Sequence, residues 1–161
     1  MSFVQDCVSI SRQHLMAGYL AEAEMSCRTA LQAEPEHSDA THLLGVIALR
    51  SNRAAEANEL FSKAIELDGA RAEFHNSRGV LFYGCRRFEE AQGEFAKAVM
   101  LDEQDPVSHN NLGNALRALG RLADAEPCFR RAVALRPGYA EAHNNLGNTL
   151  RELGSLSEAE F

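Results

Sequence analysis

The pentapeptide Asn-Asn-Leu-Gly-Asn at residues 110–114 returns unchanged at residues 144–148, an interval of 34 residues. The same interval leads back from Gly113 to Gly79, Gly45 and Ser11. An alanine also recurs every 34 residues through the whole chain, at Ala23, Ala57, Ala91, Ala125 and Ala159. Because these markers stay in phase, the chain is built from one repeated unit.

Two further markers follow the same interval. One is aromatic in three of its four copies (Phe61, Phe95, Phe129, with Cys27 in the first), and the other is Ala30, Ala64, Ala98 and Ala132. Counted from Val4, the repeat units are residues 4–37, 38–71, 72–105, 106–139 and an incomplete 140–161. Each unit is expected to hold two helices separated by a turn, which contains Gly18, Asn52, Arg86, Gly120 or Gly154. The sequence therefore predicts an all-α protein that forms a single domain over residues 1–161.

Composition excludes several classes of function. The net charge of −7 argues against nucleic acid, which would require a basic surface. No apolar run reaches the roughly 18 residues of a membrane helix, and no signal peptide precedes the repeats, so a cytoplasmic location is expected. The four cysteines lack metal-binding spacing, so neither a metal nor a cofactor is expected.

The two faces of the first helix in each unit differ in chemistry. At about 100° per residue, Leu112, Leu116 and Leu119 fall on one side, which we predict to be core. Residues 107, 110, 111, 114, 117 and 118 occupy the opposite arc, where Asn and Arg are frequent. This second face is predicted to be open and polar.

Two other regularities have structural interpretations. An acidic residue precedes each alanine marker, at Glu22, Glu56, Glu90, Asp124 and Glu158. All five fall in the first turn of a second helix, where the helix dipole favours a carboxylate, so a catalytic array is the weaker reading. His75, His109 and His143 share one repeat position and are predicted to be structural, because the spacing supplies no partner ligands for a row of metal sites.

The Leu-Gly, Ala, Phe and Pro pattern with a 34-residue period resembles the tetratricopeptide repeat over residues 4–161. That resemblance implies an α-solenoid: a right-handed superhelix of antiparallel helix pairs whose first helices line a concave groove for extended peptides or partner helices. The sequence His-Asn-Asn-Leu-Gly-Asn at residues 109–114 and 143–148 is similar to repeats in the arrays of O-linked N-acetylglucosamine transferases and their bacterial relatives. In those arrays a ladder of asparagines grips the peptide backbone.

The positions that match this ladder are Asn111 and Asn145, whereas Ser9, Leu43 and Ser77 occupy it in the earlier units. A carboxamide suits the role because it offers both a donor and an acceptor to any peptide unit, although Asn also solvates a polar face. The predicted peptide-binding residues are Asn76, Asn110, Asn111, Asn114, Arg117, Asn144, Asn145, Asn148 and Arg151. The arginines suit an acidic ligand, and the N-terminal end of the groove is expected to be apolar, with Val8 and Leu43.

The resulting prediction is a protein–protein interaction module with no catalytic residues, since no nucleophile-and-base pair or phosphate loop is present. Two alternatives stay open: a substrate-recognition arm of a larger enzyme such as a glycosyltransferase, and a self-assembling scaffold. The fifth unit lacks the Phe and the second Ala marker. We therefore expect its segment after Gly154 to fray or to support a homo-oligomer through the incomplete repeat.

Overall fold

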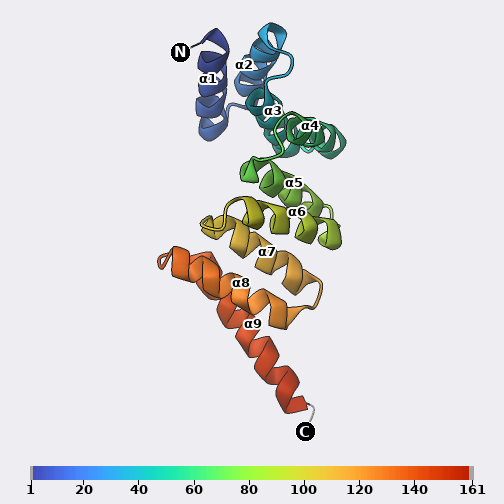
Figure 1. The fold of residues 1–161 in the computed structure, drawn as a ribbon, viewed down its shortest axis with the longest axis vertical. Coiled ribbons are helices and arrows are strands. Elements are labelled where there is room, and N and C mark those ends of the chain that lie inside the picture. The colour runs from blue at the N-terminus through green and yellow to red at the C-terminus, as the bar shows by residue number, and fades with distance from the viewer. Residues whose placement is uncertain (1, 160–161) are drawn as a thin grey trace. The chain divides into compact units, whose positions relative to one another are not determined.

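The computed structural model describes the backbone of residues 2–159 and the side chains of residues 2–154. In this part of the chain there are nine helices and no strand (Figure 1). The first helices of the repeats are α1 (Phe3–Ala17), α3 (Ser38–Arg50), α5 (Ala72–Gly84), α7 (Pro106–Ala118) and α9 (Ala140–Ala159). The second helices are α2 (Leu20–Ala33), α4 (Ala54–Leu67), α6 (Phe88–Leu101) and α8 (Leu122–Leu135). The predicted order of five first and four second helices is confirmed.

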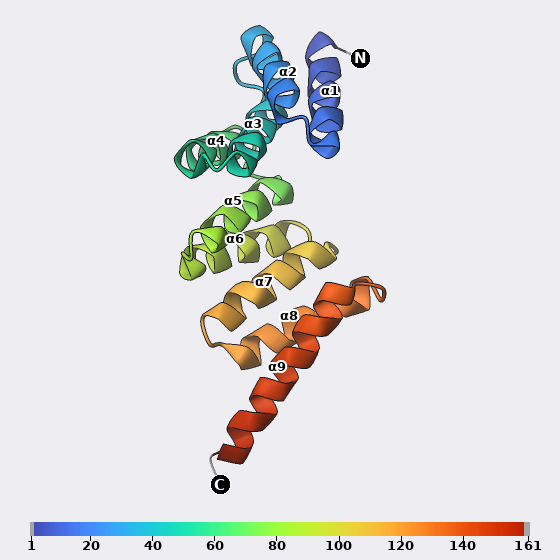
Figure 2. The same ribbon diagram turned by 180° about the vertical axis from the view of Figure 1, so that it is seen from behind.

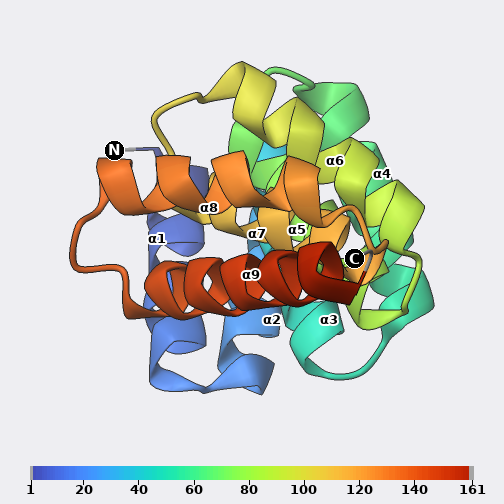
Figure 3. The same cartoon turned by 90° about the horizontal axis from the view of Figure 1, so that it is seen from below.

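The chain forms two compact units, Met1–Leu81 and Phe82–Phe161. In the first unit α1 packs on α2, α3 packs on α4, and α2 also contacts α3. In the second unit α7 packs on α6 and α8, and α9 lies alongside α8 (Figures 2 and 3). Within each unit, most contacts join helices that are neighbours in sequence, and smaller contacts join the first helices of successive repeats (α1 with α3, α7 with α9), which is the stacking of a repeat protein. A single domain over residues 1–161 stays a prediction.

Four of the five predicted turns reverse the chain through a left-handed backbone. The residues with positive φ are Gly18 (85°), Asn52 (59°), Arg86 (60°) and Gly120 (75°), all at one repeat position. Glycine adopts this conformation without strain, and Asn tolerates it better than most side chains. The conformation lets the second helix of each repeat fold back onto the first.

The fifth predicted turn is wrong. Helix α9 continues from Ala140 to Ala159 and passes through Gly154 without reversing. Adding a residue to an existing helix forms one hydrogen bond at little cost, whereas starting a new helix of a few residues carries the nucleation cost. The side chains of residues 155–161, including Leu156, lie outside the described residues, as does any fraying of the last two.

Glycine lets paired helices approach each other at the Leu-Gly marker. A Cβ atom on Gly45 would lie 2.7 Å from Cε1 of Phe61, and one on Gly113 would lie 2.6 Å from Cε1 of Phe129. Both phenylalanines are fully buried. The glycine and phenylalanine markers are therefore a packing pair, in which the ring of the second helix fills the space above the glycine of the first.

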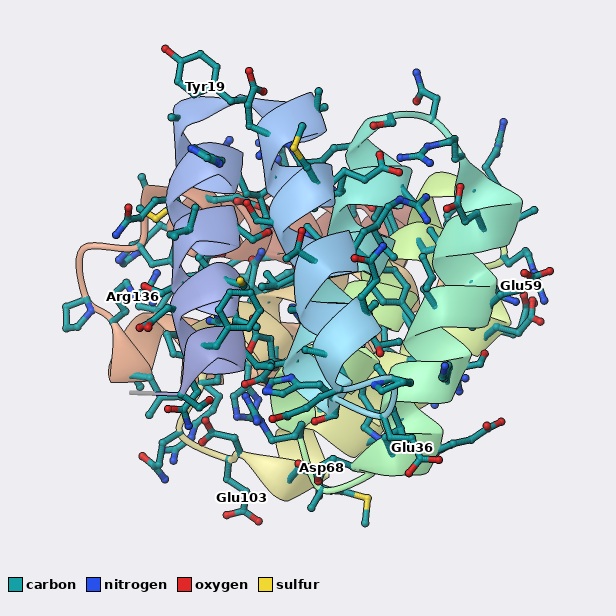
Figure 4. All side chains as sticks on the ribbon, turned by 90° about the horizontal axis from the view of Figure 1, so that it is seen from above. Tyr19, Glu36, Glu59, Asp68, Glu103 and Arg136 are labelled. Carbon is teal, nitrogen blue, oxygen red and sulfur yellow. The ribbon has the colours of Figure 1, made fainter. Side chains whose placement is uncertain are left out.

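Three of the acidic residues in the first turns of the second helices have arginine partners that the sequence analysis did not predict. An arginine occupies the N-cap of α4, α6 and α8, and its side chain binds the carboxylate three residues later. The pairs are Arg53–Glu56 (2.9 Å), Arg87–Glu90, and Arg121–Asp124 (2.7 Å). In α2 the N-cap is Tyr19, whose side chain points away from α1 and α2 (Figure 4). This charge pairing supports the structural interpretation of the acidic row.

The three histidines at one repeat position also have a structural role, as predicted. In each, Nε2 lies within hydrogen-bond distance of the carbonyl oxygen six residues earlier. The pairs are His75 with Gly69 (3.2 Å), His109 with Glu103 (3.1 Å) and His143 with Pro137 (2.8 Å). Each histidine thus ties its helix to the loop that leads into it.

Candidate functional site

A polar stripe runs along α7 and is repeated on α9, both in the second unit. On α7 it consists of Asn111, Asn114 and Arg117, which are all half-buried. The residues 34 positions later on α9 are Asn145, Asn148 and Arg151, of which the arginine is exposed. A spacing of three residues keeps the members of each row on one side of their helix. We call these six residues the Asn-Arg stripe.

Asn110, which was predicted to flank a bound peptide, is instead a core residue. Its side chain is fully buried. Its Nδ2 donates to Oε1 of Glu141 (3.0 Å), and its Oδ1 accepts from Nδ2 of Asn145 (3.0 Å). The prediction from helix periodicity was wrong here because it considers one helix alone, whereas α9 covers this part of α7.

The hydrogen bond between Asn110 and Asn145 joins residues that are 35 apart, and it fixes α9 against α7. Asn144, at the same repeat position as Asn110, is exposed. Asn76 also shares that position, but it belongs to the first unit and is half-buried. Of the nine predicted residues, the structure therefore brings six into the stripe, leaves Asn144 on the surface beside it, buries Asn110 and places Asn76 in the other unit.

The first unit contains an equivalent link between residues 35 apart. Nε2 of His42 lies 2.8 Å from Oγ of Ser77, and the ring of His42 stacks on Phe74 with a centroid distance of 4.5 Å. Burial is the main cause that lowers the pKa of His42, from 6.5 to about 4, and the positive charge of Arg12 adds to it. The ring is therefore neutral at pH 7.

Protonation of His42 would leave a buried donor unpaired. Among the described residues Nδ1 has no hydrogen-bond partner, so the neutral tautomer that fits carries its proton on Nε2 and donates to Ser77. Sequence reading did not single out His42. Its repeat position could have indicated its role, because asparagine occupies that position in the three later units.

The surface of the first unit is more polar than predicted. Val8 and Leu43, expected to line an apolar groove, are 7% and 4% exposed and belong to the core between α1, α2 and α3. The surface depression in this region has a volume of about 310 Å³ and is lined by Gln5, Val8, Ser9, Arg12, His37 and Asp39. Asp39 forms ion pairs with Arg71 (3.0 Å) and, at 3.9 Å, with Arg12. Its charge is thereby balanced within the unit.

The electrostatics of the Asn-Arg stripe are asymmetric along the helices. At one end, the carboxylate of Glu141 receives the hydrogen bond from Asn110. At the other end lie Arg117, in the last turn of α7, and Arg151, whose guanidinium donates to Oδ1 of Asn148 (2.7 Å). A carboxamide has two N–H groups and two acceptor sites. The stripe therefore places four carboxamides beside two positive charges.

The repeats, the turns and the glycine–phenylalanine packing agree with the family comparison. Models described as tetratricopeptide repeat match residues 14–81 and residues 110–160. The chain belongs to the tetratricopeptide repeat family. Among curated proteins, none matches the chain in sequence.

Solved structures with low sequence identity share the fold. PilF of Pseudomonas aeruginosa superposes with a TM-score of 0.89 at 22% identity, over 98% of this chain and 72% of its own. YrrB, described as a tetratricopeptide protein with an unusual peptide-binding site, gives 0.74 at 21% identity, over 92% and 76%. An O-GlcNAc transferase of Thermobaculum terrenum gives 0.77 at 22% identity, over 82% of this chain but 26% of its own. The transferase thus shares the repeat fold with this chain, as PilF and YrrB do.

Within the described part of the chain, no helix combines the length and the hydrophobicity needed to cross a membrane.

Proposed function

We propose that the chain is a protein–protein interaction module that binds an extended peptide across the Asn-Arg stripe of α7 and α9. The observation that carries the proposal is the bond between Asn110 and Asn145. It links α7 to α9, where Asn145 and Asn148 stand at the same repeat positions as Asn111 and Asn114. A row of carboxamides at regular intervals suits a peptide backbone, whose N–H and C=O groups also recur at regular intervals.

The corrected position of Asn110 sharpens this proposal. A buried, doubly bonded Asn110 links the two helices, and Asn111, Asn114 and Asn148 are the residues that we propose to contact the ligand. Asn145 takes part in both roles, because only part of its carboxamide is used by Asn110. Peptide binding by YrrB is a property of that protein, and it supports the proposal that this chain uses the shared fold in the same way.

The test is selection of peptides from a random displayed library on the whole chain, followed by affinity measurements with synthesised copies of the selected sequences. The variant Asn111→Ala/Asn114→Ala should weaken their binding by about 1–3 kcal/mol, through lost hydrogen bonds. The matched control is Gln92→Ala, which removes a half-buried carboxamide from α6 of the same unit. Equal affinity of the selected peptides for the double variant and the control would refute the proposal.

The proposal assigns no catalytic step to this chain. Membership of a larger enzyme as its recognition arm, self-association through the C-terminal repeat and a cytoplasmic location all stay predictions. Sedimentation velocity over a concentration series tests self-association directly.

A further inference from the structure

One face of α9 is open although the same face of α7 is covered by α8. A Cβ atom on Gly113 of α7 would lie 2.6 Å from the ring of Phe129, whereas one on Gly147 of α9 would meet no atom within 4 Å among the described residues. Leu116 of α7 is 5% exposed, and Leu150, at the same repeat position on α9, is 40% exposed. We call the exposed residues His143, Gly147 and Leu150 the open face of α9.

The open face is separate from the Asn-Arg stripe. At about 100° per residue, Gly147 and Leu150 lie on the side of α9 opposite to Asn145 and Asn148. Leu146 lies on a third side, where it packs against the core cluster of α7 and α8. A ligand on the open face would therefore leave the stripe accessible.

The other repeats show what covers this face. In the pairs α3–α4 and α7–α8, the second helix places a fully buried phenylalanine above the glycine of the first helix. Fully buried alanines lie four residues before and three residues after that phenylalanine. The residues are Ala57, Phe61 and Ala64 in α4, and Ala125, Phe129 and Ala132 in α8. Alanine lets the helix backbones approach each other, and the ring fills the space above the glycine.

The open face is also formed in advance of binding. Helix α9 is continuous from Ala140 to Ala159, and Ala142 and Thr149 are fully buried on the side that the open face does not use. A ligand therefore does not have to order α9 when it binds, which lowers the entropic cost of association. The ligand has to supply one apolar helix face.

We propose that the open face of α9 is a docking site for an amphipathic helix of a partner protein, which carries the pattern Ala-x-x-x-Phe-x-x-Ala. The partner helix takes the place on α9 that α8 takes on α7. Its phenylalanine lies above Gly147, its alanines face α9, and its apolar side covers Leu150. This site lies outside the surface of the proposed function and binds a helix rather than an extended peptide.

The test uses a synthetic peptide with the sequence of residues 53–68, which contains Ala57, Phe61 and Ala64 and neither glycine nor proline. Isolated helices of this length are marginally stable in water. A lactam bridge between Glu59 and Lys63, which are both exposed in α4, therefore holds the peptide helical. In polarisation titrations with the whole chain, the labelled peptide should bind saturably. A peptide with Phe61→Ala should bind at least about tenfold more weakly, because the ring supplies most of the apolar surface.

Variants of the chain locate the bound peptide. Gly147→Leu places a side chain in the space that the ring would take, so it should weaken binding at least about tenfold. The matched control is Gly93→Leu on α6, where an added Cβ also meets no atom within 4 Å among the described residues; it should leave the affinity unchanged. Circular dichroism checks that both variants keep their helices. The inference is overturned if the bridged peptide does not bind, if the Phe61→Ala peptide binds equally well, or if the two glycine variants behave alike.

Two further outcomes assign the face or the peptide elsewhere. Self-association of the chain that Gly147→Leu abolishes would make a second copy the occupant and overturn the partner helix. Loss of helix binding in Asn111→Ala/Asn114→Ala would place the peptide on the stripe and would also overturn it. The proposed function is tested separately, because library peptides that bind the stripe should keep their affinity for Gly147→Leu.

Discussion

Replacing Gly113 by alanine tests the packing pair that defines each repeat. The new Cβ atom would lie 2.6, 2.8 and 2.9 Å from three ring carbons of Phe129, whereas relaxed carbon–carbon contacts are about 3.5–4.0 Å. The ring is fully buried and has to shift to make room. Gly147 has the same repeat position on α9, but its Cβ would meet no atom within 4 Å among the described residues.

The two substitutions share one favourable contribution and differ in one unfavourable contribution. Alanine is preferred over glycine inside a helix by about 1 kcal/mol, and this applies equally to Gly113 and Gly147. Overpacking a filled core costs about 1–3 kcal/mol, and this applies only to Gly113. The propensity gain cancels in the comparison. Gly113→Ala should therefore be less stable than Gly147→Ala by about 1–3 kcal/mol, and Gly147→Ala should exceed the parent in stability.

The measurement is urea denaturation followed by circular dichroism, with hydrogen exchange at the amides of α7 and α8 as a local readout, because repeats unfold with their neighbours. Adding Phe129→Leu to Gly113→Ala should cost less than Phe129→Leu costs in the parent, since the smaller side chain relieves the clash. Equal shifts for the two glycine variants would refute the reasoning, because the helix propensity would then account for the whole effect.

Two further predictions concern the links between residues 35 apart. Since the pKa of His42 lies at about 4 in the folded chain, below its usual 6.5, stability is lost as the pH falls from 6.5 towards 4. In urea titrations the loss of stability should reach about 2 kcal/mol at pH 5. The variant His42→Asn should not show this loss. If stability falls with pH in parallel for the two proteins, the prediction is wrong. Asn110→Ala should cost about 1–3 kcal/mol through the unpaired partners it leaves, while Asn144→Ala at the same repeat position should stay within about 0.5 kcal/mol of the parent; similar losses in thermal melts would contradict the different burial of the two asparagines.

The fold was predictable because its determinants recur within the chain. The glycine, alanine and phenylalanine markers identified the helix pairs, and Gly18, Asn52, Arg86 and Gly120 identified the turns between them. The one exception among these turns is Gly154. There the local sequence is compatible with both a turn and a helix. Residues 155–161 are too few to form a second helix of ordinary length whose packing would stabilise the turn.

The site was predictable only in part, because helix periodicity describes a helix by itself. Asn111, Asn114 and Arg117, on the arc that was predicted to be open, are half-buried. Asn110 lies on the same arc but is covered by α9, and this depends on how repeats stack rather than on the sequence of α7. The burial of Val8 has the same origin, since α3 contributes to the core around it.

The link between residues 35 apart has a consequence for changes in repeat number. The two linked residues belong to successive repeats. Inserting a repeat between them therefore separates the existing pair and creates two new pairs. A duplication of residues 106–139 would pair Asn110 with the second copy of Asn111, and the second copy of Asn110 with Asn145. Both new pairs join two carboxamides, as the existing one does. The bond that links successive repeats is therefore kept when the chain lengthens by a whole repeat, but the second copy of Val107 takes the place of Glu141, the acceptor of Asn110 Nδ2, in the first of the two pairs.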